Sequence, residues 1–251
     1  MKKQEVNNKV LIIGGTSAIA RSAAFNFVRN GCHVAVTSRK LDDAKAVADD
    51  LKVRTGADVI HFEFKPEDLN NHKLLFDELI KGAFEFDYIL IAHGTLPDNN
   101  LIKNDVDKVL KEFNINFLSV ISIATIAAEY FETVGRGTIG VITSVAGDRA
   151  RQSNYIYGTA KGAVSLYLQG LRNRLFSKGI KVVTIKPGFV DTPMTATFKK
   201  NALFAKPDVV GKQIYEAMLK SKDIVYVPGF WRLIMFIIKH IPESIFKKLN
   251  L

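Results

Sequence analysis

Short apolar runs rich in β-branched residues alternate with helix-length segments along almost the whole chain. The runs that predict strands are Val10–Ile13, Val34–Thr37, Val59–Phe64, Tyr88–Ala92, Thr138–Thr143, Lys181–Ile185 and Ile224–Val227. The segments with helical spacing of apolar residues are Ala18–Asn30, Asp42–Lys52, His72–Lys81, Asp105–Thr133, Tyr155–Ser177 and Pro207–Lys220. This alternation predicts an α/β fold with a doubly wound parallel sheet and helices on both faces, a three-layer α/β/α arrangement.

The 251 residues contain no linker, internal repeat or shift in composition that would divide them into two domains. We therefore predict a single domain over residues 1–228, followed by an amphipathic C-terminal appendage over residues 229–251. In sheets of this kind ligands bind beyond the carboxyl ends of the strands, where the strand order reverses. The first strand-to-helix turn is the first place to look for a ligand.

The chain carries a formal net charge of +10, but its Lys and Arg residues are spread along the sequence. No basic run interleaved with aromatic residues is present, so the charge does not predict nucleic-acid binding. The single cysteine, Cys32, closes no internal disulfide, and the apolar run Val10–Ile13 after the polar Met1–Lys9 is short for a signal peptide. These features favour a cytoplasmic protein.

The first turn reads Gly14-Gly15-Thr16-Ser17-Ala18-Ile19-Ala20, between an apolar strand and a helix. Small residues here let the backbone approach a pyrophosphate, and the N–H groups at the helix start favour its negative charge. Ala18 and Ala20 stand where such turns usually have glycine, so each adds a methyl group. The alternative is a tight turn that binds no ligand.

The second predicted strand is followed by Ser38 and Arg39, where a carboxylate would favour NAD by holding the ribose 2′-hydroxyl. The Arg39 guanidinium instead suits a 2′-phosphate, and the Ser38 hydroxyl can share that contact. We therefore predict a preference for NADP(H) over NAD(H). A solvated charge at the start of the next helix is the alternative for Arg39.

Tyr157 and Lys161 stand four residues apart near the start of a helical segment, so their side chains share one face. A nearby ammonium favours phenolate and lowers the pKa of a tyrosine, which predicts a tuned proton donor. Ser144 ends the preceding strand and is placed to hold a substrate oxygen, and Asn116 is placed to anchor a proton-relaying water. Taken alone, a Tyr–Lys pair is more often a helix-surface contact.

The order of these motifs resembles the short-chain dehydrogenase/reductase family over nearly the whole chain. The matching residues are Gly14-x-x-x-Ala18-x-Ala20, Asn116, Ser144, Tyr157-Gly158-Thr159-Ala160-Lys161 and Pro187-Gly188-Phe189-Val190-Asp191-Thr192. The resemblance implies a Rossmann-type fold and hydride transfer between a nicotinamide and an alcohol or carbonyl. It makes Tyr157 the acid–base, Lys161 its activator and a ribose ligand, Ser144 the substrate orienter and Asn116 the relay, with no metal ion.

The resemblance also implies a set of cofactor-binding residues. They are Gly14, Thr16, Ser17, Ala18, Ile19, Ser38, Arg39, Glu63, Phe64, Ala92, His93, Gly94, Tyr157, Lys161, Pro187, Gly188, Val190 and Thr192. Two positions depart from the family pattern. Ile91-Ala92-His93-Gly94 replaces the usual Asn-Asn-Ala-Gly, so His93 is either a turn-filling residue or an extra proton donor, and Glu63 replaces an Asp that often contacts adenine.

The appendage combines Trp231, Phe230 and Phe236 with four cations, Arg232, Lys239, Lys247 and Lys248, against the single acid Glu243. Its longest uncharged run is too short to span a bilayer. Three interpretations stay open: a segment in the membrane interface, a flap over the substrate pocket, and an oligomer contact.

The tail and the run Asp148-Arg149-x-Arg151-x-Ser153-Asn154 further resemble the decaprenylphosphoryl-2-keto-erythro-pentose reductases, short-chain enzymes that reduce a keto-pentose on a polyprenyl phosphate. That resemblance implies a lipid-linked carbonyl substrate at the inner face of a membrane. A reductase or dehydrogenase of another hydrophobic ketone or alcohol, and a non-catalytic NADPH sensor or assembly subunit, are the alternatives. Related enzymes pair through the two long helices, here Asp105–Thr133 and Tyr155–Ser177, which leads us to expect a homodimer or homotetramer.

Overall fold

The centre of the molecule is a seven-stranded parallel sheet with the order β3-β2-β1-β4-β5-β6-β7. The computed structural model describes residues 8–82 and 84–249. The strands are β1 (Lys9–Ile13), β2 (His33–Ser38), β3 (Ile60–Glu63), β4 (Tyr88–Ile91), β5 (Thr138–Ile142), β6 (Lys181–Pro187) and β7 (Ile224–Val227). The chain winds outward from β1 in one direction and then resumes from β4 in the other, so the strand order reverses between β1 and β4.

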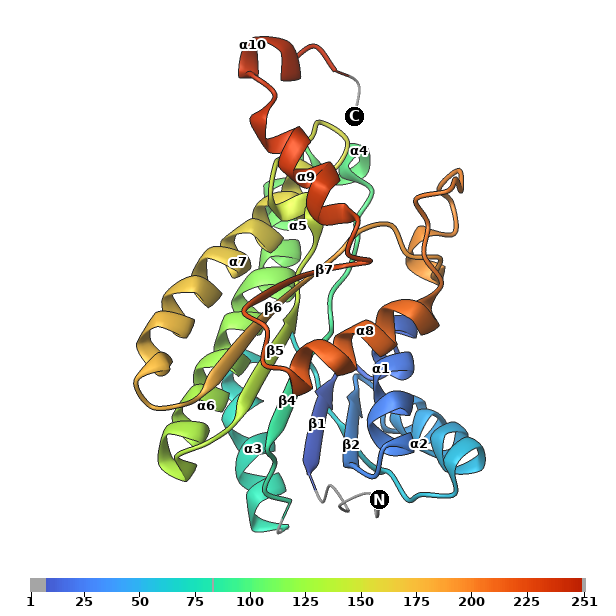
Figure 1. Ribbon diagram of the computed structural model, residues 1–251, viewed down its shortest axis with the longest axis vertical. Coiled ribbons are helices and arrows are strands. Elements are labelled where there is room, and N and C mark those ends of the chain that lie inside the picture. The colour runs from blue at the N-terminus through green and yellow to red at the C-terminus, as the bar shows by residue number, and fades with distance from the viewer. Residues whose placement is uncertain (1–7, 83, 250–251) are drawn as a thin grey trace.

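Helices cover both faces of this sheet (Figure 1). One face is covered by α1 (Ala18–Arg29), α2 (Leu41–Thr55) and α8 (Pro207–Leu219), and the other by α3 (His72–Lys81), α6 (Ser119–Val134) and α7 (Tyr155–Phe176). Shorter helices are α4 (Asn99–Ile102), α5 (Val106–Phe113), α9 (Trp231–His240) and α10 (Glu243–Phe246). The predicted doubly wound α/β/α fold is therefore confirmed.

The first strand shows why its sequence is apolar at consecutive positions. Successive side chains of a strand point to opposite faces of a sheet. Val10 and Ile12 accordingly belong to the core under α1, α2 and α8, whereas Leu11 and Ile13 belong to the core under α3, α6 and α7. All four are fully buried, as expected for a strand covered on both sides.

The predicted helix Asp105–Thr133 is interrupted in the structure. It consists of α5, a π-helical turn over Asn114–Leu118, and α6. Such turns insert one extra residue and often lie at functional sites, and this one contains Asn116. The whole stretch Val106–Val134 is long and apolar enough to cross a membrane, but Val120, Ile123 and Phe131 within it are buried against the sheet.

The C-terminal segment is packed against the domain at the end of the sheet where the strands finish (Figure 1). Trp231 and Met235 of α9 are buried with Val145, which directly follows the predicted catalytic Ser144. Arg149 binds this segment from the same loop: its guanidinium donates to the carbonyl oxygens of Ile238 (3.0 Å), Lys239 (3.1 Å) and Ile241 (2.6 Å), and it forms an ion pair with Glu243 (2.9 Å).

Two predicted segments are only partly described by the structure. Residues 1–7 of the polar N-terminal segment Met1–Lys9 lie outside the described residues, and so do residues 250 and 251 at the end of the predicted appendage.

Candidate active site

A cavity of about 530 Å³ opens beyond the carboxyl ends of the strands, next to the reversal between β1 and β4. Most predicted site residues line it: Gly14, Thr16, Ser17, Ala18, Ile19, Ser38, Arg39, Phe64, Ala92, His93, Gly94, Ser144, Tyr157, Lys161, Pro187, Gly188, Val190 and Thr192. Glu63 and Asn116 are not among the lining residues. The topology thus brings together groups from six strand ends into one cavity.

The turn after β1 is shaped for close approach to a phosphate. Gly14 has a φ of +84°, and a Cβ there would lie 2.7 Å from the backbone nitrogen of His93, so only glycine fits. Ser17 caps α1 without a side-chain hydrogen bond to the helix. The first N–H groups of α1 are therefore open to a pyrophosphate, as the cofactor requires.

The two alanines of the turn do not obstruct the cavity in the same way. Ala20 is fully buried in the core beneath α1, where its methyl group packs against protein. Ala18 lines the cavity, so its methyl group lies at the cavity edge, where a glycine would have only a hydrogen. The departure at Ala20 therefore concerns the packing of α1, and only the departure at Ala18 affects the cavity.

At the far end of the cavity, where the adenosine ribose would lie, Ser38 is the last residue of β2 and the exposed Arg39 follows it. Glu63 at the end of β3 forms an ion pair with Lys65 at 2.9 Å, and this contact lowers the pKa of the Glu63 carboxyl. The predicted contact of Glu63 with adenine stays a prediction.

His93 fills the turn after β4 as a neutral side chain. Its Nε2 lies 2.7 Å from Ser119 Oγ, and the Ser119 hydroxyl in turn donates to the Ile115 carbonyl at 2.6 Å. Because that hydroxyl proton is already committed, Nε2 must be the donor and Nδ1 is left unprotonated. Burial and the nearby Lys161 lower the pKa of His93 to about 3, which favours the turn-filling role over that of a proton donor.

The three predicted catalytic side chains at the centre of the cavity come from two elements. Ser144 follows β5, and its Oγ accepts a hydrogen bond from the Ala146 N–H at 3.1 Å while the hydroxyl also pairs with Tyr157. Tyr157 and Lys161 lie one turn apart on α7, with Lys161 Nζ 5.8 Å from the centre of the tyrosine ring. The Lys161 ammonium donates to the Ile142 carbonyl at 3.3 Å.

The expected lowering of the tyrosine pKa is not what the structure shows. Burial raises the pKa of Tyr157 to about 12, and its hydrogen bond with Ser144 offsets only part of that effect. Burial also lowers the pKa of Lys161 to about 8. The prediction was wrong because it counted the attraction of the ammonium and omitted the removal of water from the phenol. Tyr157 is therefore held in its protonated form.

Asn116 stands behind the cavity wall rather than on it. Its Oδ1 accepts from the Thr95 N–H at 3.0 Å, and its Nδ2 donates to Thr95 Oγ1 at 2.9 Å and to Glu112 Oε2 at 3.1 Å. A Cβ at Gly94 would lie 2.8 Å from Asn116 Oδ1 and 3.2 Å from Lys161 Nζ. Glycine at position 94 thus leaves room between the amide and the ammonium, and the relay role of Asn116 stays a prediction.

Several groups at the site were not found from the sequence. Thr95 and Glu112 hold Asn116, and a polar residue directly after Gly94 at the end of β4 was the available signal for Thr95. Arg151 and Asn154 line the cavity from the loop that enters α7; they belong to the run that resembles the keto-pentose reductases, but they were not predicted as site residues. Phe189, Met194 and Phe198 form an apolar wall after β6 that no local pattern distinguishes from core residues.

A doubly wound sheet with an open helix N-terminus at its reversal, beside a Ser–Tyr–Lys group whose lysine is buried, is the arrangement of a nucleotide-dependent oxidoreductase. The family model described as short chain dehydrogenase matches residues 8–203, most of the chain. The protein belongs to the short-chain dehydrogenase/reductase family of NAD(P)-dependent oxidoreductases.

Individual relatives agree with this assignment. An uncharacterized oxidoreductase of Mycobacterium tuberculosis is 27% identical over 241 residues, which cover 96% of both chains. The 3-oxoacyl-[acyl-carrier-protein] reductase of Homo sapiens is 28% identical over 195 residues, 76% of this chain and 79% of that protein. The structure of ElxO with NADP bound superposes with a TM-score of 0.80 at 21% identity, covering 88% of this chain and 97% of ElxO.

Proposed function

We propose that the protein is an NADP(H)-dependent carbonyl reductase whose substrate is the keto-pentose of a polyprenyl-phosphate sugar. The observation that carries the reductase assignment is that Ser144, Tyr157 and the buried Lys161 line one cavity, which begins at the turn after β1. Reduction of a carbonyl needs a proton donor at the substrate oxygen. Tyrosine is already protonated at neutral pH, and burial raises the pKa of Tyr157 further, so the phenol carries the proton that the reaction needs.

The residues divide the reaction among them. The reduced nicotinamide, when bound, supplies the hydride to the carbonyl carbon. The Tyr157 hydroxyl gives its proton to the carbonyl oxygen, and the C=O double bond becomes an alcohol. Ser144 holds that oxygen beside the phenol, and the Lys161 ammonium stabilises the negative charge left on Tyr157.

The preference for NADP(H) rests on Arg39. Its guanidinium is exposed at the adenosine end of the cavity, next to the buried Ser38. A planar guanidinium makes bidentate contacts with a phosphate and makes none of comparable strength with a ribose hydroxyl. The NADP held by the structural relative ElxO is consistent with this assignment.

The proposed substrate class is supported by the surroundings of the catalytic group. Phe189, Met194 and Phe198 give the cavity an apolar wall, and α9 packs behind that wall through the edge-on contact of Trp231 with Phe189 at 5.2 Å. A lipid-linked sugar needs such an entrance. A long-chain 3-oxoacyl group would use the same wall, and the human relative that reduces 3-oxoacyl-[acyl-carrier-protein] makes it the second candidate.

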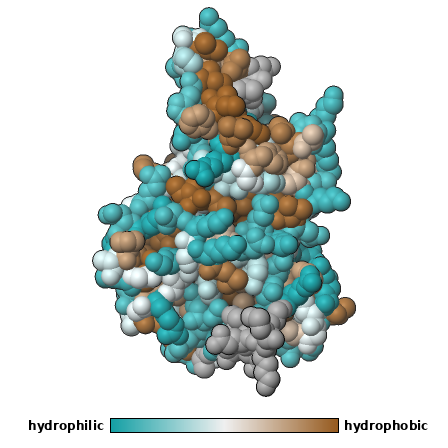
Figure 2. Space-filling view, in the orientation of Figure 1, coloured by the Kyte–Doolittle hydropathy of each residue, from teal (hydrophilic) through white to brown (hydrophobic). Residues whose placement is uncertain are grey.

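We further propose that the C-terminal segment rests on the cytoplasmic face of an anionic membrane. Leu233, Phe236 and Ile237 of α9 are exposed, and Figure 2 shows apolar surface gathered over this end of the molecule. The segment's four cations and one acid leave it with a charge of +3 (4 − 1), which complements anionic lipid headgroups. This position would bring a lipid-linked substrate to the cavity.

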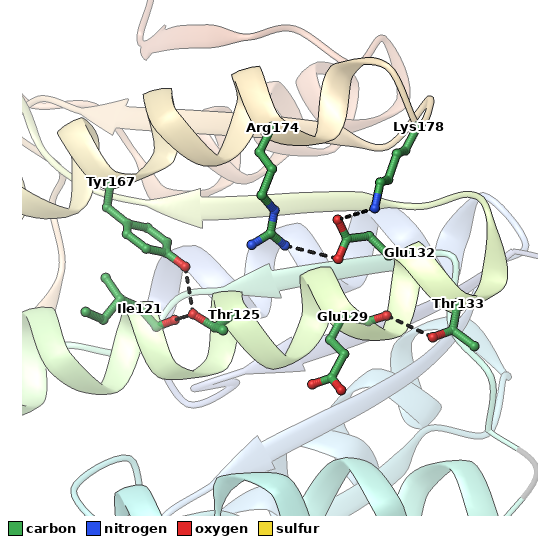
Figure 3. A network of polar contacts seen from close by, with 8 residues as sticks. All are labelled: Ile121, Thr125, Glu129, Glu132, Thr133, Tyr167, Arg174 and Lys178. Carbon is green, nitrogen blue, oxygen red and sulfur yellow. Dashed lines mark hydrogen bonds and ion pairs between the residues drawn. The ribbon is translucent and has the colours of Figure 1, made fainter.

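We propose a homodimer or homotetramer formed through α6 and α7. These helices lie side by side and are tied together by the Tyr167–Thr125 hydrogen bond at 2.7 Å and by Glu132, which pairs with Arg174 at 3.2 Å and Lys178 at 2.9 Å (Figure 3). Leu166 and Phe176 of α7 are nevertheless largely exposed. Exposed apolar residues on a rigid helix pair favour burial against a second copy.

The test is NADPH oxidation with a polyprenyl-phospho-keto-pentose and, separately, with a 3-oxoacyl thioester. We expect kcat/KM for the keto-pentose to exceed that for the thioester by at least about tenfold. The reverse order would select the acyl reductase. If the protein oxidises NADPH with neither of these two substrates and with no other ketone, the proposed activity is refuted.

A further inference from the structure

Arg151 is a half-buried guanidinium that lines the cavity six residues before the catalytic Tyr157. Its backbone carbonyl accepts from Asn154 at 3.0 Å, but within residues 8–82 and 84–249 its side chain has no hydrogen bond or ion pair. Burial lowers the pKa of Arg151, and no acidic neighbour opposes that effect. A partly desolvated cation without a counter-ion is costly to a fold, and an anionic ligand that paired with it would remove that cost.

The neighbouring Arg149 shows the contrast. It comes from the same loop, yet its guanidinium is fully used by three carbonyl groups and Glu243 of the C-terminal segment, and it stacks on Phe246 at 3.8 Å. Arg149 therefore has a structural role, whereas Arg151, two residues later, lines the cavity and its side chain has no partner within the part of the chain that the structure describes.

The acidic residues that line the cavity lie away from Arg151. The carboxylates among the described lining residues are Asp43 and Glu67. Asp43 lies in the first turn of α2, which follows β2, and Glu67 follows β3, so both are at the adenosine end, whereas Arg151 lies between β5 and α7 at the catalytic end. Among the described lining residues, the catalytic end thus has the Arg151 cation and no carboxylate, in the same cavity as Ser144 and Tyr157.

We propose that Arg151 binds the phosphate group of the carbonyl substrate. The proposal rests on the reductase function argued above and names the group that its site recognises. In a 2-keto-pentose 1-phosphate the carbonyl and the phosphate-bearing carbon are adjacent, so a phosphate contact must lie beside Tyr157 and Ser144. A guanidinium suits this position because its planar fork pairs with two phosphate oxygens at once.

Binding without turnover tests the subsite apart from the chemistry. The protein is saturated with NADP⁺, which cannot reduce a ketone, and titrated by calorimetry with two matched pairs. Dihydroxyacetone phosphate and dihydroxyacetone represent a soluble phosphosugar with adjacent carbonyl and phosphate. Farnesyl phosphate and farnesol represent a lipid phosphate. The variants are R151Q, R151K and the control R174Q, which removes an exposed arginine from the far end of α7.

We expect the phosphate member of at least one pair to bind the unmodified protein about 10- to 100-fold more tightly than its neutral partner, as charged hydrogen bonds in a partly dry site allow. R151Q should reduce that ratio to below about threefold, R151K should keep part of it, and R174Q all of it. The pair that shows the preference identifies the phosphate as sugar-borne or lipid-borne.

Two results would overturn the assignment of Arg151. The first is an affinity ratio of phosphate over neutral ligand that is the same in R151Q as in the unmodified protein, including a ratio near one in both. The second is a loss of NADPH affinity in R151Q as large as its loss of affinity for the phosphate ligand. Phosphate selectivity that depends on Arg151, in a protein that reduces no ketone, would instead refute the reductase function and leave the subsite standing.

Discussion

Lys161 provides a quantitative test because its side chain is almost wholly buried. A lysine ordinarily titrates near pH 10.4, and burial lowers the pKa of Lys161 to about 8. The difference corresponds to about 3 kcal/mol by which the ammonium destabilises the folded protein. Lys161→Met keeps the length and apolar volume of the side chain and removes the charge, so it should stabilise the fold and abolish turnover.

The pH dependence gives the prediction its sign. Below about pH 8 the lysine is charged in both the folded and the unfolded chain, and the full cost is present. Between pH 8 and 10.4 the unfolded chain binds more protons than the folded one, so the stability of the unmodified protein rises with pH. K161M should therefore be more stable by about 3 kcal/mol at pH 7, and this advantage should nearly vanish by pH 10.5.

The assay is urea denaturation of both proteins at pH 7 and pH 10, with the free energy of unfolding taken from each curve. Groups shared by both proteins cancel in the difference. Lys178→Met serves as the control, because Lys178 is exposed and pairs with Glu132 (Figure 3). A K161M variant that is no more stable than the unmodified protein at pH 7, or whose advantage grows with pH, would refute the account of a desolvated ammonium.

Three further outcomes follow from the site and the tail. Arg39→Ala should raise the KM for NADPH about 10- to 100-fold and leave that for NADH within about threefold, and equal losses for both cofactors would contradict the 2′-phosphate contact. Gly188→Ala places a Cβ 1.9 Å from Trp231 Nε1, so it should lower the free energy of unfolding by about 1–3 kcal/mol in thermal or urea denaturation. An unchanged unfolding midpoint would contradict this, because it would mean that α9 can move away from the new methyl group without cost. Removal of residues 229–251 should abolish flotation with anionic liposomes, and undiminished flotation would eliminate the membrane contact.

The fold was predictable because its signals are local. Apolar runs such as Val10–Ile13 are buried on both faces of the sheet, and the period of strand–helix alternation leaves few other architectures. The phosphate turn and the Tyr157–Lys161 pair are also local patterns. A parallel sheet brings the ends of its strands to one edge, so residues from distant parts of the chain could be assigned to one cavity before it was seen.

The environment of these residues was not predictable in the same way. The pKa of Tyr157 depends on how much water the finished cavity excludes, and the position of the proton on the His93 ring depends on Ser119, 26 residues further along. The contacts of Arg149 with the tail join residues about 90 positions apart, which no periodicity encodes. The π-helical turn at Asn116 interrupts a sequence whose apolar pattern is that of a continuous helix.

The central claim is that Tyr157 gives the proton to a substrate carbonyl. Its most direct test is the turnover of Tyr157→Phe with NADPH and the best ketone found, together with the affinity of the variant for NADPH. The account predicts a fall in kcat of about 10²- to 10⁴-fold, with the dissociation constant for NADPH unchanged within about threefold. Full turnover by the variant would contradict the account.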